Sequence, residues 1–219
     1  MTGRTMKLVM TGLLLLAMVG QPRAQAEQTP EDVIVTVFSD AVELLIERED
    51  ELRDNLDLTV SLIDQTLSPH VQVPLMSQLI LTTHWRTASP EQQARFVAAF
   101  RQHLLRTYAR LLLDNLDEVI ETVGRDESLL RVRSSTEPDR RGRVTVRTDL
   151  ELVDEVLPID YRLIAIDDGW QIWDIVIENI SFVINYRDEF GSRADALGLE
   201  GLIAELEDRD TTARAGSEP

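Results

Sequence analysis

The spacing of apolar residues changes twice along the chain and divides it into three regions. From Pro30 to about Asn115, apolar residues recur three and four positions apart, which is typical of helices that bury one side. After Asp117 apolar and polar residues alternate, which is typical of strands, and from Phe182 the helical spacing returns. We therefore expect helices at residues 30–45, 56–67, 74–83, 90–115, 182–190 and 197–206.

Two of these helices begin at recognisable capping residues. Thr29 can cap a helix whose first position is Pro30. Ser89 can cap a second helix that has Pro90 at its first position and Gln92 to complete a capping box. The second helix carries large apolar side chains four residues apart: Phe96, Phe100, Leu104, Tyr108 and Leu112. It therefore presents a broad apolar stripe to the elements that pack against it.

The alternating region predicts a sheet of five strands, at residues 119–123, 129–136, 143–153, 159–166 and 170–181. The connections are short and contain turn residues such as Gly124, Pro138 and Gly169, so consecutive strands should be antiparallel neighbours. In the third strand Val144 and Val146 share one face while Arg143 and Arg147 share the other. One face of the sheet should thus be covered, and the expected class is α+β with helices packed on one face of the sheet.

Both ends of the chain are expected to lie outside the folded domain. Residues 1–26 combine a basic flank, a short apolar stretch from Leu8 to Gly20 and a small-residue site ending at Ala26, which indicates a cleaved secretory signal peptide. The domain should then span residues 27–209, followed by a disordered polar tail at 210–219. No later stretch is long and apolar enough to span a membrane, so we expect a soluble, exported protein.

The charge of the chain excludes one large class of partners. The formal net charge is −17, and loss of Arg4, Lys7 and Arg23 with the signal peptide takes it to −20. Without a basic stripe the protein has nothing with which to neutralise nucleic-acid phosphates, and it should not adhere to an anionic membrane surface.

Few residues suggest catalysis or metal binding. The chain has no cysteine, and His70, His84 and His103 have no partner at metal-ligand spacing, so we expect neither a thiolate nor a metal site. The strand from Trp170 to Ser181 is apolar on both faces. Strict alternation puts Trp170, Ile172 and Val176 on one face and Trp173, Ile175 and Ile177 on the other. Two interpretations fit this strand, an ordinary filled core or the wall of an apolar cavity.

Several stretches resemble the MlaC family of periplasmic phospholipid-binding proteins, also known as toluene-tolerance auxiliary components of an ABC transport system. The motifs are W-R-x-A-S-P-E-Q-x-x-x-F at 85–96, T-Y-A at 107–109, W-x-I-W-D-I at 170–175 and N-Y-R-x-x-F at 185–190. The resemblance runs in order from about Pro30 to Arg209. Asn179 departs from it, because the family usually has glycine there.

The resemblance implies a strongly twisted sheet and helices that enclose a deep apolar pocket, and a carrier that holds a glycerophospholipid by its acyl tails. Its implied partners are an outer-membrane lipoprotein complex and an inner-membrane MCE-protein/ABC-transporter complex; no cofactor is implied beyond the lipid cargo. Two buried tails would need a pocket near or above 1,000 Å³. The residues expected to line it are Leu79, Phe96, Phe100, Leu104, Tyr108, Leu112, Val146, Leu150, Tyr161, Leu163, Trp173, Ile175 and Ile177.

Three other functions remain open from the sequence. The first is an enzyme, or another protein for small apolar ligands, on an NTF2-like cone-shaped fold, for which Tyr161 or Asp174 would supply the chemistry. The second is an adaptor with a filled core, and the third is a periplasmic carrier of lipoproteins. A cavity with apolar walls would separate the carriers from the adaptor.

Overall fold

The computed structural model describes residues 28–53, 55–124, 129–152, 155–167 and 169–215, with side chains as far as residue 208. Its helices are α1 (Pro30–Leu52), α2 (Leu56–Leu67), the short 3₁₀ helix η1 (Ser68–His70), α3 (Val73–Leu81), α4 (Thr83–Thr87), α5 (Pro90–Asp114), α6 (Leu116–Val123) and α7 (Phe182–Ala215). Its strands are β1 (Leu130–Ser135), β2 (Arg143–Glu151), β3 (Val156–Ile166), β4 (Gly169–Ile177) and β5 (Ile180–Ser181). The expected signal peptide, residues 1–26, lies outside the described residues.

The two predicted helix starts are confirmed. The hydroxyl of Thr29 accepts the backbone N–H of Asp32 at 3.1 Å, with Pro30 at the first position of α1. At the start of α5, the Ser89 hydroxyl accepts the N–H of Gln92 at 3.1 Å, and the Gln92 side chain accepts the N–H of Ser89 at 3.1 Å. Both starts were predictable because a capping box needs only residues that are close in sequence.

The predicted strand at 119–123 is wrong, because this segment is the helix α6. Its β-branched residues favour a strand when the segment is read with a period of two residues. However, Leu116, Val119, Ile120 and Val123 stand at helical spacing, and these are the buried and half-buried positions of α6. The acidic residues between them face solvent. A helix is the only one of the two structures that puts all four apolar side chains on one side.

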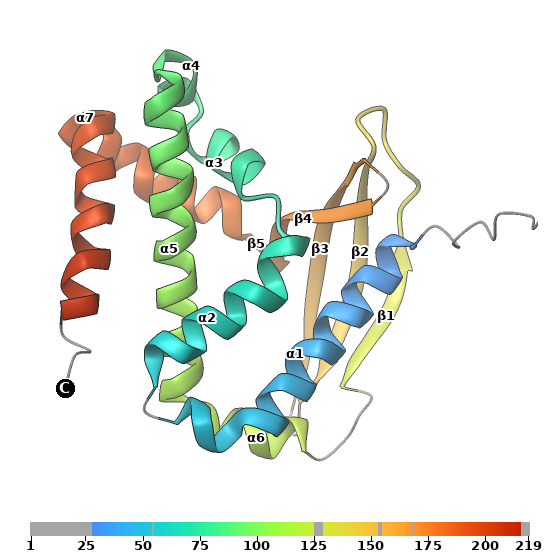
Figure 1. Ribbon diagram of the computed structural model, residues 1–219. Helices are drawn as coiled ribbons and strands as arrows, with labels where there is room; N and C mark the ends of the chain where they lie inside the picture. Colours follow the sequence, from blue (N-terminus) through green and yellow to red (C-terminus); the bar gives the residue numbers. More distant parts are fainter. Residues whose placement is uncertain (1–27, 54, 125–128, 153–154, 168, 216–219) are drawn as a thin grey trace, which may run out of the picture.

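The strands form one antiparallel sheet in the order β1-β2-β3-β4-β5, as the short connections predicted. The fifth strand is not the predicted one, however, because residues 170–181 divide into β4 and the two-residue β5. Glu178 and Asn179 adopt left-handed backbone angles, with φ of 49° and 66°, which turn the chain back on itself. The sheet is strongly twisted, and β4 runs across the direction of β2 and β3 in Figure 1.

Two separate clusters of buried side chains hold the fold together. In the first, which we call the sheet cluster, Val33 and Ile34 of α1 pack on the inner face of the sheet against residues such as Val146 and Leu163. The second, the helical cluster, is formed by α3, α5 and α7 and includes Phe96, Phe100, Phe190, Leu202 and Ile203. Figure 1 shows α1 lying across one face of the sheet while α5 and α7 stand beside it. The fold is therefore α+β with helices on one face, as predicted.

Helix α7 is longer than the sequence suggested and is bent. Gly198 has φ 72° and ψ 161°, which interrupt the helix between its two arms. The second arm turns back along α5, where Arg95 forms ion pairs with Glu200 and Glu207. The backbone is helical to Ala215, whereas the sequence predicts a disordered tail from residue 210, and residues 216–219 lie outside the described part. Among the described helices, none is long and apolar enough to cross a membrane.

Candidate functional site

A cavity of about 550 Å³ lies between the sheet cluster and the helical cluster. Its volume is within the range of small-molecule binding pockets. Most of its wall is apolar and comes from α2, the connection between α2 and α3, α3, α5, β4, β5 and the start of α7. These residues are Ile63, Leu67, Val71, Val73, Met76, Leu104, Leu105, Tyr108, Ile172, Ile175, Ile177, Ile180 and Phe182. The polar residues of the wall are Ser68, Arg101, Asp174, Glu178 and Asn185.

The wall formed by β4 is fixed to the helices by hydrogen bonds. The backbone N–H of Gln72 donates to the carbonyl of Ile172 at 2.8 Å, and the Gln72 side-chain amide donates to Gln171 at 2.9 Å. Gln171 in turn donates to the carbonyl of Pro69 at 3.0 Å. These bonds attach the connection between α2 and α3 to the edge of β4, so the strand cannot move freely towards α5.

A second attachment uses the buried carboxylate of Asp174. One of its oxygens accepts the backbone N–H of Val183 at 2.9 Å, and the other accepts the Ser181 hydroxyl at 2.7 Å and an Arg162 N–H at 2.8 Å. The Ser181 hydroxyl also accepts the N–H of Ile184, so Asp174 and Ser181 together cap α7. The side chain of Asp174 is 1% exposed and both its oxygens are occupied, which is the arrangement of a structural carboxylate.

Aromatic rings form the end of the cavity near α7. The ring centroids of Tyr108 and Phe182 are 5.7 Å apart, and those of Phe182 and Tyr186 are 4.7 Å apart. Burial raises the pKa of Tyr108, so its phenol stays neutral at physiological pH. At this end Tyr108, Ile177 and Ile180 are 40%, 42% and 65% exposed. The cavity therefore has an edge where apolar side chains meet water.

The structure brings four of the sequence-predicted wall residues to the cavity, namely Leu104, Tyr108, Ile175 and Ile177. Phe96 and Phe100 belong instead to the helical cluster, where both are 0% exposed, and Leu79 packs against the same cluster. Val146 and Leu163 are fully buried in the sheet cluster, with Tyr161 packed beside them. Leu112 and Leu150 are half-buried and do not line the cavity. Because these side chains fill space, the cavity has about half of the expected volume.

Trp173 does not line the cavity, and a β-bulge is the reason. In the pairing of β3 with β4, Leu163 lies opposite Ile172 and Arg162 lies opposite Asp174, so Trp173 is an extra residue. The bulge shifts the alternation by one residue. As a result Ile172 and Ile175 share the inner face, while Trp173 lies on the outer face, with its ring centroid 4.7 Å from the Arg143 guanidinium carbon.

Sequence reasoning missed the wall residues of α2 and α3, such as Ile63, Leu67 and Met76. These residues form the ordinary apolar stripes of short helices, and the sequence carries no local signal that such a stripe faces a hollow. Arg101 was also missed, since it is one charged residue among several on α5. The position of β4 beside the cavity depends on the contact between Gln72 and Ile172, and these two residues are 100 positions apart in the sequence.

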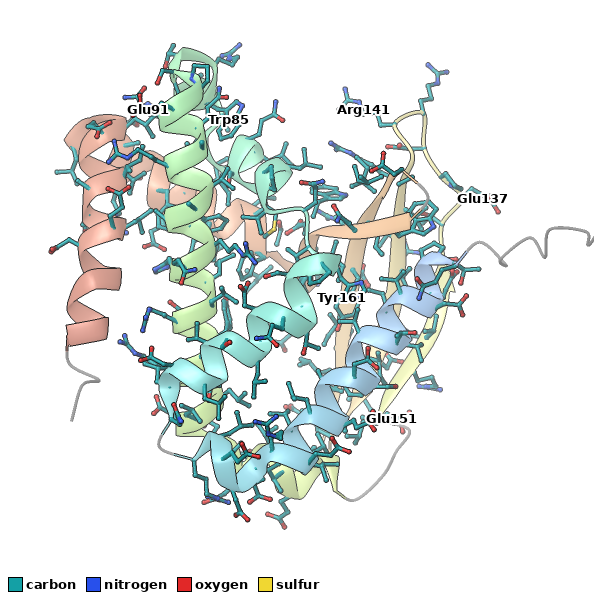
Figure 2. The ribbon with its side chains drawn as sticks, viewed as in Figure 1. Trp85, Glu91, Glu137, Arg141, Glu151 and Tyr161 are labelled. Carbon is teal, nitrogen blue, oxygen red and sulfur yellow. The ribbon has the colours of Figure 1, made fainter. Side chains whose placement is uncertain are left out.

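The residues proposed for an enzyme are not placed for catalysis. Tyr161 lies between the sheet and the helices, outside the cavity wall, and burial raises its pKa to about 12 (Figure 2). Asp174 lines the cavity, but its oxygens are committed to the start of α7. Another hollow of similar volume, between Arg53 and Glu118, has mainly charged and polar walls and would gain little from an apolar ligand.

Comparisons with known proteins agree with this architecture. The chain matches the MlaC protein family over residues 36–208. It is 26% identical to the toluene tolerance protein ttg2D of Pseudomonas putida over 191 residues, which are 87% of this chain and 83% of that protein. The fold is similar to that of the phospholipid-binding protein from Ralstonia solanacearum, solved in complex with a phospholipid, with a TM-score of 0.68, 23% identity and coverage of 82% of this chain and 96% of that one. This chain belongs to the MlaC protein family.

Proposed function

We propose that this protein is a periplasmic carrier that binds a glycerophospholipid by its acyl tails in the cavity between the two clusters. The observation that carries the proposal is the cavity itself, with its mostly apolar wall between α2, α5 and β4. Family membership and the phospholipid-bound structural neighbour support the same ligand class.

The hydrophobic effect explains why such a cargo needs a cavity. Burial of one CH₂ group stabilises by about 0.8 kcal/mol, so a tail of roughly 16 carbons gains on the order of 12 kcal/mol when it leaves water. No carrier could keep that surface exposed in an aqueous compartment. The head group is polar and should remain at an edge of the cavity, in water. Binding by this route uses no cofactor and no chemical step.

We further propose that the carrier shuttles between an outer-membrane lipoprotein complex and an inner-membrane MCE-protein/ABC-transporter complex, and so maintains outer-membrane lipid asymmetry. Any ATP hydrolysis would then belong to the membrane partner. The net charge of −17 supports docking to specific partners, because it repels anionic membrane surfaces. Partners of such a protein should present basic patches, and salt should weaken their binding.

The test is native mass spectrometry of the protein purified from a bacterial periplasm, followed by lipid extraction. We expect one glycerophospholipid per chain and a mature N-terminus at Glu27, after cleavage behind Ala26. Recovery of the chain without lipid, under conditions in which a known lipid carrier keeps its cargo, would refute the proposed function. Docking to the partners can be tested separately. Glu178→Arg, at the exposed edge of the cavity, should weaken partner docking and reduce its salt dependence.

A further inference from the structure

Charged side chains lie at two edges of the cavity, and those that line it are of opposite sign. At the edge between α2 and α5 lies Arg101, together with Ser68. At the edge formed by the β4–β5 turn and α7 lie Glu178 and Asn185. Within the described residues that line the cavity, Arg101 is the only basic one. A ligand with a negative charge beside its apolar part would therefore be oriented by these edges.

The guanidinium of Arg101 is held in place but still has donors for another acceptor. Its Nε and Nη2 atoms lie 3.0 and 2.6 Å from the same oxygen of Asp64, and that oxygen also accepts the Ser68 hydroxyl. A guanidinium has five N–H groups in a planar fork, which suits two acceptors at once. The Arg101 side chain is 43% exposed, so a phosphate at the edge of the cavity can reach it.

Arg101 stands at one end of an apolar strip along α5. Leu104, Leu105 and Tyr108 follow it by three, four and seven residues, so their side chains share its side of the helix. The strip is roughly 10 Å long, from the helical rise of 1.5 Å per residue. This sequence of one cation followed by apolar side chains matches a glycerophospholipid, in which the phosphate is joined through glycerol to the tails.

The other charged groups of the wall do not favour a phosphate. Glu178 is exposed and would repel it. The oxygens of Asp174 are occupied by Arg162, Ser181 and Val183. We infer that Arg101 binds the lipid phosphate, and that the tails extend from it along α5 towards Tyr108. The inference rests on the proposed function and adds to it the orientation of the lipid and a preference for lipids that carry a phosphate.

The experiment compares two lipids that have the same tails. Delipidated protein is incubated with equal amounts of phosphatidylglycerol and diacylglycerol in mixed micelles, and the lipids that remain bound after gel filtration are quantified by mass spectrometry. We expect Arg101→Gln to lower the bound phosphatidylglycerol-to-diacylglycerol ratio roughly five- to tenfold, because one charge-assisted pair is lost at a partly exposed site. Arg101→Lys, which keeps the charge but not the fork, should give an intermediate ratio.

Arg110→Gln is the matched control, because Arg110 is an exposed arginine on the same helix that does not line the cavity. We expect it to change the ratio less than about twofold. Glu178→Gln tests the opposite edge of the cavity. A ratio that Arg101→Gln leaves unchanged would overturn the inference, whether or not total binding falls. If Glu178→Gln raised the ratio while Arg101→Gln left it unchanged, the phosphate would lie at the edge with Glu178. That result would also overturn the inference. Failure of the wild-type protein to retain either lipid would instead refute the proposed function.

A free phosphate ion has the same chemistry as a lipid phosphate, so a further arm separates the two. Inorganic phosphate in large excess should lower the wild-type ratio no more than sodium chloride of equal ionic strength does, because the tails anchor the lipid phosphate beside Arg101. A specific loss of phosphatidylglycerol in inorganic phosphate would show a site for the free ion and contradict the inference.

Discussion

The two halves of α5 carry the same apolar stripe but have different surroundings. In the first half Phe96 and Phe100 are fully buried, with ring centroids 5.8 Å apart, and Phe190 of α7 packs edge-on against both. In the second half Leu104 and Tyr108 face the cavity. The first half contacts helices that can approach closely, whereas the second faces α2 and β4. An apolar stripe therefore says which side of a helix is buried, and the elements opposite decide whether the space is filled.

The attachments of β4 explain why the second half remains hollow. Gln72 fixes the strand to the connection before α3, and Asp174 fixes it to the start of α7. Both attachments are hydrogen bonds, which are directional, so they fix the position of β4. At this position the apolar side chains of β4 and α5 do not fill the space between the two elements.

The largest expected effect is a loss of stability when the filled half is truncated. Phe100→Ala should lower the free energy of unfolding by about 3–5 kcal/mol, because it leaves a new void among packed rings. Leu104→Ala is the control on the hollow half and should cost only about 1 kcal/mol, since that side chain already borders a cavity. Urea unfolding of the two variants measures both effects. Equal losses would mean that the two halves are packed alike.

A pH-dependent effect should come from Tyr161, which sits beside the sheet cluster. Burial raises its pKa to about 12, whereas the unfolded chain ionises near its ordinary value of about 10. Between these values the unfolded state loses the proton first, so stability falls as pH rises, by about 2–3 kcal/mol over the full window. Tyr161→Phe should remove this part of the loss when urea unfolding is followed from about pH 9 upwards. An unchanged slope in the variant would indicate a wet environment around the phenol.

Lipid binding should respond to filling of the hollow half. Leu104→Trp places a larger side chain in the cavity and should reduce retained phospholipid at least about tenfold, while changing stability by less than about 2 kcal/mol. Leu111→Trp is the matched control, because Leu111 is on the same helix but 55% exposed. Lipid extraction from equal amounts of purified protein gives the comparison. Equal retention by both variants would place the lipid elsewhere.

The smallest effect is expected at the outer face of the sheet. Trp173→Leu removes the stacking of Arg143 on the indole and should cost about 0.5–1 kcal/mol of stability without reducing lipid retention. This result separates the observed bulge from strict alternation, which would place Trp173 against the tails. A marked loss of lipid in this variant would show that the alternation held after all.

Features encoded in neighbouring residues could be predicted from the sequence, and features that depend on distant contacts could not. The caps at Thr29 and Ser89 and the antiparallel order of the strands follow from short stretches, and they are confirmed. The extra residue Trp173 puts the side chains that follow it in β4 on the face opposite to the one that strict alternation predicts. The apolar residues of α6 can be read at strand or at helical spacing, and only the helical reading is correct. The cavity depends on bonds between segments such as Gln72 and Ile172, which only the folded chain brings together.

The central claim is that acyl tails occupy the hollow beside the second half of α5. The most direct test is photo-cross-linking with a phospholipid that carries a photoreactive group in the middle of one tail, followed by peptide mapping. The account predicts cross-links to the cavity wall, at Leu104, Tyr108 and Ile175, and none at Phe96 or Phe100. Cross-links confined to surface residues, or spread equally over both halves of α5, would contradict it.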